Sequence, residues 1–209
     1  MNEQSDIGVG PHPRPWPTDD RYDSELLEHG DRRNVIDTYR YWKVEAIKAD
    51  LDRTRIPLQI AVENVGRDFN MGTIIRSANA FNVRTVHIIG SRQWNKRGAM
   101  VTDIYMNIEY HTDVDAFDTA MRMAKKEIIA VDIVEGAKGI ASVELNPDCV
   151  LVFGAEGPGL STELLSVADQ VVMIEQLGST RSVNVGVAAG IAMYEWVRRF
   201  TLDSSVPKS

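Results

Sequence analysis

The sequence predicts an α/β protein built on a mostly parallel sheet that helices cover on both faces. From residue 56 onward, short apolar runs alternate with segments of helical periodicity. Strands that alternate with helices favour a parallel sheet. Each crossover helix covers one face and returns the chain to the end of the sheet at which the previous strand began. The chain has 209 residues, of which 44% are hydrophobic and 25% charged, so it is long enough for one buried domain and an extension.

The first 55 residues are predicted to lie outside this domain. Proline at every second position from Pro11 to Pro17 favours an extended, polyproline-like chain, so residues 1–22 are expected to be a flexible arm. Trp16 within the arm could anchor on the body of the protein or stack on a base. Residues 23–55 are expected to be a helical extension, because helix-favouring charged residues there accompany a partial apolar stripe of Ile36, Tyr39, Trp42, Val44 and Ile47.

The domain itself is expected over residues 56–200, with a tail at 201–209. Its predicted strands are residues 57–64, 83–90, 127–134, 149–154 and 170–174, and its predicted helices are residues 70–81, 113–126, 161–168 and 182–200. Cys149 begins one of these strands and is expected to be a small core residue. Because it is the single cysteine, an intramolecular disulfide is excluded.

Composition excludes several classes of protein. The longest apolar run, roughly residues 183–194, is too short to span a bilayer, and the N-terminus has no signal-peptide pattern, so we expect a cytoplasmic protein that makes no membrane contact. The four histidines show no metal-ligand spacing with one another or with the cysteine, so no metal site is predicted. A net charge of -7 argues against coating nucleic acid through the overall field, although it permits a local basic face.

Three junctions between a predicted strand and the following helix carry unusual residues. In parallel sheets, ligands bind where loops leave the carboxyl ends of the strands. The first junction is "ENVGRDFNMGTIIRSA", residues 63–78, in which Asn70 can cap the helix. Arg76 follows inside the helix among apolar neighbours. Such an arginine is ordinarily a solvated surface group, but its surroundings here favour a functional role.

The other two junctions come late in the chain. "VFGAEGPGLS", residues 152–161, contains glycines that bring backbone groups close to a planar or anionic ligand, but their spacing differs from that of a dinucleotide-binding loop. "VVMIEQLGSTRSVNVGVAAG", residues 171–190, places Ser182 and Asn184 at the entrance of a helix of small residues. These side chains can hydrogen-bond the backbone or a ligand. Helix capping explains one of them, but not both together with the small residues that follow, which would permit close packing of the helix.

Together these motifs resemble the SPOUT superfamily, specifically the SpoU/TrmH-type tRNA and rRNA ribose 2'-O-methyltransferases. The likeness covers roughly residues 57–199 and includes, in order, "NMGTIIR", "FGAEGPGLS" and "STRSVNVGVAAGIAMYEW". The resemblance implies transfer of a methyl group from S-adenosyl-L-methionine to a ribose 2'-hydroxyl of structured tRNA or rRNA. It also implies a deep C-terminal trefoil knot, which is an exception among folds, and a homodimer with a composite active site.

The resemblance assigns residues to this site. The catalytic ones would be Asn70, Arg76, Glu156, Ser182 and Asn184. Those in contact with the cofactor would be Phe153, Gly154, Ala155, Gly157, Ile174, Gln176, Leu177, Gly178, Val183, Asn184 and Ala188. The sequence departs from the family at Glu175 and Gln176, where many relatives have Pro-Met, and at Val183 and Gly186, where Leu and Ser are frequent. Arg76 is the family's proposed base, although a guanidinium normally stays protonated, so it could instead fix an RNA phosphate.

Two other functions are compatible with parts of the pattern. One is a catalytically silent RNA-binding module on the same scaffold, against which the complete polar set argues. The other is a nicotinamide-dependent dehydrogenase, which is disfavoured because no glycine fingerprint follows the first strand. RNA contacts are expected from phosphate pairing and base stacking by Arg92, Trp94, Lys96 and Arg97 in the loop at residues 91–100, and from Arg32 and Arg33 in the extension.

Overall fold

The computed structural model describes residues 8–64, 70–154 and 159–203. Within them, seven parallel strands form one sheet in the order β3-β2-β1-β6-β4-β7-β5. The strands are β1 (Ile56–Asn64), β2 (Val83–Gly90), β3 (Ile108–His111), β4 (Glu127–Val131), β5 (Lys138–Gly139), β6 (Cys149–Phe153) and β7 (Gln170–Met173).

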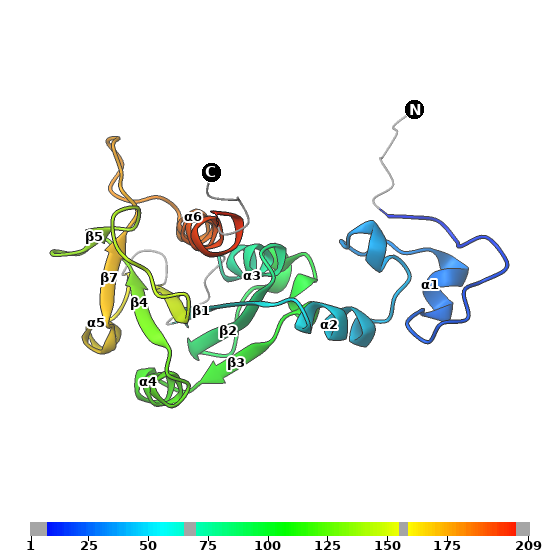
Figure 1. The fold of residues 1–209 in the computed structure, drawn as a ribbon, viewed down its shortest axis with the longest axis horizontal. Helices are drawn as coiled ribbons and strands as arrows, with labels where there is room; N and C mark the ends of the chain where they lie inside the picture. Colours follow the sequence, from blue (N-terminus) through cyan, green and yellow to red (C-terminus); the bar gives the residue numbers. More distant parts are fainter. Residues whose placement is uncertain (1–7, 65–69, 155–158, 204–209) are drawn as a thin grey trace.

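Helices lie on both faces of this sheet (Figure 1). One face carries α3 (Met71–Ala80) and α6 (Val185–Val197), and the other carries α4 (Val114–Met123) and α5 (Thr162–Val167). The strands supply both cores by alternation. On β1, Leu58 and Ile60 join the cluster that contains α3 and α6, whereas Ala61 joins the cluster under α4 and α5. The predicted α/β class, with both faces of a parallel sheet covered, is confirmed.

All the strands and helices predicted for the domain are present, with some bounds displaced. The strand predicted at residues 127–134 ends at Val131, and the helix predicted at residues 182–200 begins at Val185 and continues as a π-helical turn over Arg198–Leu202. Two strands at the edges of the sheet, β3 and β5, and the 3-10 helices η2 (Lys96–Ala99) and η3 (Thr102–Tyr105) were not predicted. Cys149 is fully buried as predicted, and this burial raises the pKa of its thiol to about 12.

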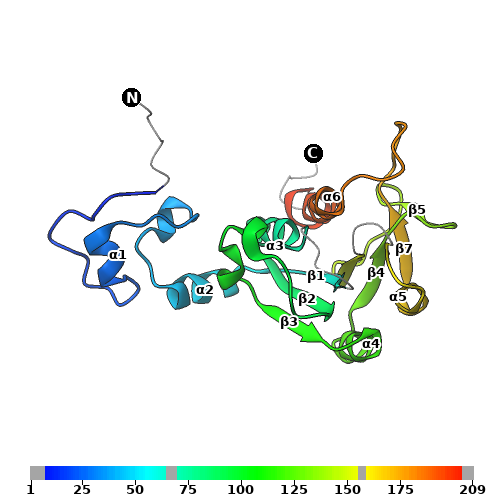
Figure 2. The ribbon, with the colours of Figure 1, turned by 180° about the vertical axis from the view of Figure 1, so that it is seen from behind.

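The extension forms a small lobe beside the domain (Figures 1 and 2). It contains α1 (Ser24–His29), the 3-10 helix η1 (Asp37–Tyr39) and α2 (Val44–Asp52), which leads into β1. The described part of the proline-rich arm is hydrogen-bonded to this lobe: the Val9 amide donates to the Asp31 carbonyl at 2.9 Å, and the His12 amide donates to the Leu27 carbonyl at 2.8 Å. The Trp16 indole donates within the arm, to the carbonyl of His12.

A buried arginine connects the lobe to the sheet. Arg55 pairs with Asp52 at the end of α2, and its guanidinium donates to the carbonyls of Val83 and Tyr105 at 3.2 and 2.7 Å. Tyr105 packs in turn on Trp42 and Ile47. Among the residues that the structure describes, no helix is both long and apolar enough to cross a membrane.

Candidate functional site

A cavity of about 270 Å³ opens at the carboxyl ends of β4, β6 and β7. Ligands of open parallel sheets bind at these carboxyl ends of the strands. Most of the described residues that the motifs assign to the site line the cavity: Phe153, Gly154, Ile174, Gln176, Ser182, Val183, Asn184 and Ala188. The structure therefore brings the second and third motifs together around one hollow.

The glycines of the second motif are required by close backbone packing. A Cβ atom at Gly154 would collide with the backbone of Gly159, which itself adopts a positive φ of 74° beside the carboxylate of Asp132. The Leu160 amide donates to that carboxylate at 2.8 Å. Two stretches of backbone consequently meet at the cavity wall, where a ligand can approach peptide groups directly.

Asn184 joins the first and third motifs. Its side-chain oxygen caps α6 by accepting from the amides of Gly186 and Val187 at 3.0 and 3.3 Å. Its side-chain nitrogen donates to the side-chain oxygen of Asn70 at 2.9 Å, and Asn70 directly precedes α3. Because the cap fixes the orientation of the amide, the Asn184 nitrogen is held toward the first motif.

A polar side chain in the cavity wall has no partner. Both the side-chain nitrogen and the oxygen of Gln176 are buried, and neither forms a hydrogen bond with the residues that the structure describes. A buried polar group left in this state costs about 1–3 kcal/mol. The amide of Gln176 is therefore available to hydrogen-bond a polar group inside the cavity.

Other residues that the motifs assign to the site lie away from the cavity. Arg76 is exposed on α3, does not line the cavity and makes no hydrogen bond or ion pair with a described residue. Leu177 and Gly178 are exposed in the loop between β7 and α6, outside the cavity lining. Ala155, Glu156 and Gly157 lie outside the described residues.

The residues predicted to contact RNA have different surroundings. Arg92 and Arg97 are exposed, and the Lys96 ammonium pairs with Asp103 at 2.8 Å. Trp94 packs partly against the larger core cluster.

In the extension, Arg32 is exposed, whereas Arg33 is partly buried and its guanidinium donates to both carboxylate oxygens of Asp31 at 2.9 and 2.7 Å. Arg33 thus has a structural partner inside the lobe.

The motifs missed part of the cavity wall. Val131, Asp132 and Ile133 line it at the end of β4. Gly159, Met173 and Val185 also line it; they lie within the second and third junctions but were not assigned to the site. The signal was available for Asp132, because a polar residue directly after an apolar strand of a parallel sheet lies at the ligand-binding edge. It was hidden because residues 127–134 were predicted as one continuous strand.

The model of the SpoU rRNA Methylase family matches residues 57–194. The chain belongs to this family. A curated relative of this SpoU family member is the tRNA (guanosine(18)-2'-O)-methyltransferase of Escherichia coli K12, which is 28% identical over 153 residues. The match covers 71% of the chain and 66% of the relative, so the chain spans slightly less than two thirds of that relative's length.

Solved structures share the fold of this SpoU family member. The A. aeolicus TrmH/SpoU tRNA modifying enzyme superposes with a TM-score of 0.67 at 22% identity, over 77% of the chain and 84% of the enzyme. The SpoU methyltransferase AviRb from Streptomyces viridochromogenes, in complex with the cofactor AdoMet, gives a TM-score of 0.58 at 25% identity, over 70% of the chain and 60% of AviRb.

Proposed function

We propose that this SpoU family member transfers a methyl group from S-adenosyl-L-methionine to a ribose 2'-hydroxyl of tRNA or rRNA. The observation that carries the proposal is the cavity and the polar groups in its wall. The unpartnered amide of Gln176 lines it, and so does Asn184, which is hydrogen-bonded to Asn70. The name of the E. coli relative and the cofactor bound to AviRb support the reaction and the cofactor.

The residues of the cavity fit the cofactor's chemistry. S-adenosyl-L-methionine supplies an activated sulfonium methyl group together with a polar amino-acid end and a planar base. Phe153, Ile174 and Ala188 give the cavity an apolar surface, and Gln176 gives it hydrogen-bonding capacity. We propose that these residues hold the cofactor with Gly154 and Val183, and that Ala155, Gly157, Leu177 and Gly178 complete the binding loops.

The polar residues at the entrance would position the ribose. Asn184 and Ser182 both line the cavity, and Asn70 is held against Asn184, so hydrogen bonds from this group can orient a hydroxyl toward the methyl donor. We propose that Glu156 belongs to the same group. The remaining task is loss of the hydroxyl proton, which Arg76 would assist, either as the base or by fixing a phosphate while another group accepts the proton.

A homodimer would bring Arg76 to a cavity. Val187, Ile191 and Tyr194 form an exposed apolar stripe on α6, with 53%, 41% and 51% of each residue accessible. The helix of Arg76 runs beside this stripe, because the rings of Phe81 on the α3 side and Tyr194 lie 6.4 Å apart. We propose that the stripe pairs two chains, and that Arg76 of each chain serves the cavity of its partner in a composite site.

RNA would bind across this surface and the loop at residues 91–100. Arg92, Trp94, Lys96 and Arg97 are proposed to contact RNA, together with Arg32 and Arg33 of the extension.

We propose that the chain is organised in two units, the extension at residues 23–55, which the arm precedes, and the domain at residues 56–200. The family's trefoil knot is proposed for the segment around α6, and the cytoplasm is proposed as the compartment because tRNA and rRNA are modified there.

The decisive experiment is methylation of tRNA and rRNA with labelled S-adenosyl-L-methionine, followed by mapping of alkali-resistant linkages. Ribose labelling is the expected result, and label confined to base atoms would overturn the 2'-O assignment. Arg76→Ala should lower turnover about 100-fold or more with little change in cofactor affinity. Activity that persists and depends on pH in Arg76→Lys would favour the role of base over that of phosphate binding.

The same measurements separate the second candidate, an RNA-binding module without turnover. That module would bind tRNA or rRNA and show no transfer of label. Calorimetry with S-adenosyl-L-methionine and S-adenosylhomocysteine adds an independent readout, because binding of either one requires the cavity whether or not methyl transfer follows.

A further inference from the structure

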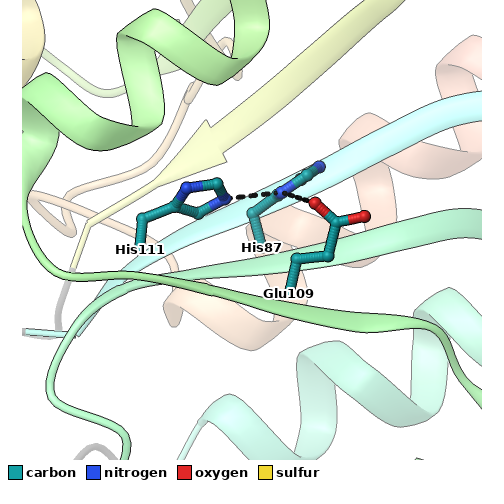
Figure 3. A group of neighbouring side chains, drawn as sticks. All are labelled: His87, Glu109 and His111. Carbon is teal, nitrogen blue, oxygen red and sulfur yellow. Dashed lines mark hydrogen bonds and ion pairs between the residues drawn. The ribbon is translucent and has the colours of Figure 1, made fainter.

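Three side chains with metal-binding atoms meet on the edge strand β3 and its neighbour β2 (Figure 3). His87 comes from β2, and its partner across the strand pair is Glu109 on β3. His111 follows Glu109 by two residues, so both point to the same face of the sheet. The group lies outside the lining of the cavity described above.

The three ligand atoms lie close enough together to surround a single metal ion. His87 Nδ1 lies 2.9 Å from His111 Nε2 and 3.6 Å from the nearer carboxylate oxygen of Glu109, and all three ligand atoms lie within 4.8 Å of one another. Bonds of about 2.0–2.2 Å to zinc at tetrahedral angles separate two ligand atoms by about 3.3 Å. The ligand atoms therefore need only small side-chain adjustments to share one ion.

A second layer of contacts orients His87 for this role. Its Nε2 lies 2.8 Å from the side-chain oxygen of Gln59, a buried residue on β1. An amide oxygen only accepts, so Nε2 carries the proton and Nδ1 presents its lone pair to Glu109 and His111. Metal-binding histidines are commonly held by such a hydrogen bond from the other ring nitrogen.

The surroundings also fix the ring planes. Phe117 of α4, which is fully buried, packs edge-on against the rings of His87 and His111, with centroids 5.9 and 5.4 Å away. His87 is 1% exposed, whereas 60% of the Glu109 side chain is accessible. The group is thus closed toward the core and open toward solvent, so an ion can enter and water can complete its coordination.

A hydrogen bond between the two histidines leaves the group incompletely paired. If His111 Nε2 carries a proton, it can donate to His87 Nδ1, but the Glu109 carboxylate then lies 3.6 Å from the same lone pair with no proton between them. We propose that His87, Glu109 and His111 bind one divalent transition-metal ion of the zinc class, which ties the edge strand β3 to β2.

Calorimetric titration of the tag-free, full-length protein with zinc chloride tests the site. One ion per chain is the expected result. Zinc should also raise the melting temperature, because an ion that binds the folded chain more tightly than the unfolded one stabilises it. Cobalt(II) should give the visible absorption of a low-symmetry site with nitrogen and oxygen ligands.

Variants assign the ion to these residues. His111→Ala, at a half-buried position, and Glu109→Gln, at an exposed one, should lose the zinc-dependent rise in melting temperature. Gln59→Leu should weaken zinc binding about 10–100-fold by releasing His87. The matched controls are His29→Ala and Glu135→Gln, which alter an exposed histidine and an exposed glutamate elsewhere. Circular dichroism without zinc confirms that each variant is folded.

Two results would overturn the site. One is the absence of saturable zinc binding to the wild-type chain. The other is zinc binding that His111→Ala and Glu109→Gln leave unchanged. None of these measurements depends on methyl transfer, so the metal site and the proposed function can fail independently.

Discussion

Asn184 uses both ends of its side-chain amide, the oxygen to cap α6 and the nitrogen to hold Asn70. Asn184→Ala should therefore lower the free energy of unfolding by about 1 kcal/mol through loss of the cap. It should also reduce methyl transfer, because Asn70 and the cavity entrance lose their orientation. Urea unfolding and the labelled-methyl assay measure the two effects separately.

The matched control is Asp113→Ala, which removes the N-cap of α4. The Asp113 carboxylate accepts from the Ala116 amide at 2.8 Å on the face of the sheet that carries α4 and α5. A similar loss of stability with unchanged methyl transfer is expected. Equal loss of activity in both variants would reduce the role of Asn184 to helix capping.

A substitution of Gln176 is expected to change the stability of the protein and its affinity for the ligand in opposite directions. Replacing its unpartnered buried amide by the similar volume of leucine should leave the free protein as stable or stabilise it by about 1 kcal/mol, because the desolvation cost disappears. Gln176→Leu should at the same time weaken S-adenosylhomocysteine binding about tenfold, through loss of one hydrogen bond. Thermal unfolding and calorimetry measure the pair of effects.

Gln170→Leu provides the contrast at the start of β7, the strand that precedes Gln176. The Gln170 side chain already donates to Glu127 at 2.8 Å and to the Glu144 carbonyl at 3.3 Å, so its loss should destabilise the protein and leave ligand affinity unchanged. Normal affinity in Gln176→Leu would show that the amide of Gln176 does not contact the ligand.

At the scale of elements, the N-terminal lobe depends on one buried carboxylate. Asp31 is fully buried, and although burial raises the pKa of its carboxyl, hydrogen bonds from the Arg33 side chain and from the amides of Arg33 and Tyr41 outweigh this and lower the pKa overall. Asp31→Asn should destabilise the lobe by about 2 kcal/mol, because Arg33 loses its charged partner. Hydrogen exchange at the Val9, Arg33 and Tyr41 amides is expected to accelerate about 30-fold.

The lowered pKa also sets the pH dependence of the lobe. A carboxyl whose pKa is lower in the folded state stabilises it above the unfolded pKa of about 3.9, and this contribution disappears as the pH falls through the folded value. Exchange in the wild-type lobe should therefore accelerate, after correction for intrinsic rates, only below about pH 4. Asp37→Asn, which alters a side chain that is 99% exposed, should change neither result.

The sequence predicted best the strands that are long, continuously apolar and buried in the sheet. β1 and β2 are long buried runs, and their predicted bounds match the structure to within one residue. β3 and β5 were missed because strands of four and two residues at the sheet edges carry no continuous apolar run. Because β3 was not predicted, the group of His87, Glu109 and His111 was not predicted either. The pairing of β2 with β3 brings His87 beside residues more than twenty positions later in the chain.

Some residues of the candidate site could also be placed from the sequence, and others could not. Motif order placed Gly154, Ser182 and Asn184 at the cavity, because each follows a strand whose carboxyl end can be located from hydrophobicity. The side-chain pairing of Arg33 with Asp31 was not predictable, since it depends on how a short lobe folds back on itself. The prediction that Arg33 contacts RNA stays a prediction, and the structure adds that its guanidinium pairs with Asp31 inside the lobe.

At the scale of the whole molecule, one chain does not bring all the assigned residues together. Asn184 lines the cavity, whereas Arg76 is exposed on α3 beside the apolar stripe of α6. If two chains pair through that stripe, each cavity can receive Arg76 from the partner. Ile191→Asp, which puts a charge into the centre of the stripe, should then yield monomers by light scattering and abolish methyl transfer while the fold persists.

Mixing two inactive proteins gives the sharpest test of such a composite site. Arg76→Ala and Asn184→Ala homodimers should each be nearly inactive, but a mixed dimer contains one cavity with an intact Asn184 that faces an intact Arg76 of the other chain. After unfolding and joint refolding at equal amounts, random pairing makes about half of the dimers mixed, and each regains one working site of two, so activity near one quarter of the wild-type value is expected. Each variant unfolded and refolded alone serves as the control, since no pairing of identical chains combines an intact Asn184 with an intact Arg76. Failure of the first mixture to exceed its two parents, with dimers demonstrated by light scattering, would place Arg76 and Asn184 in the same site of one chain or remove Arg76 from the site.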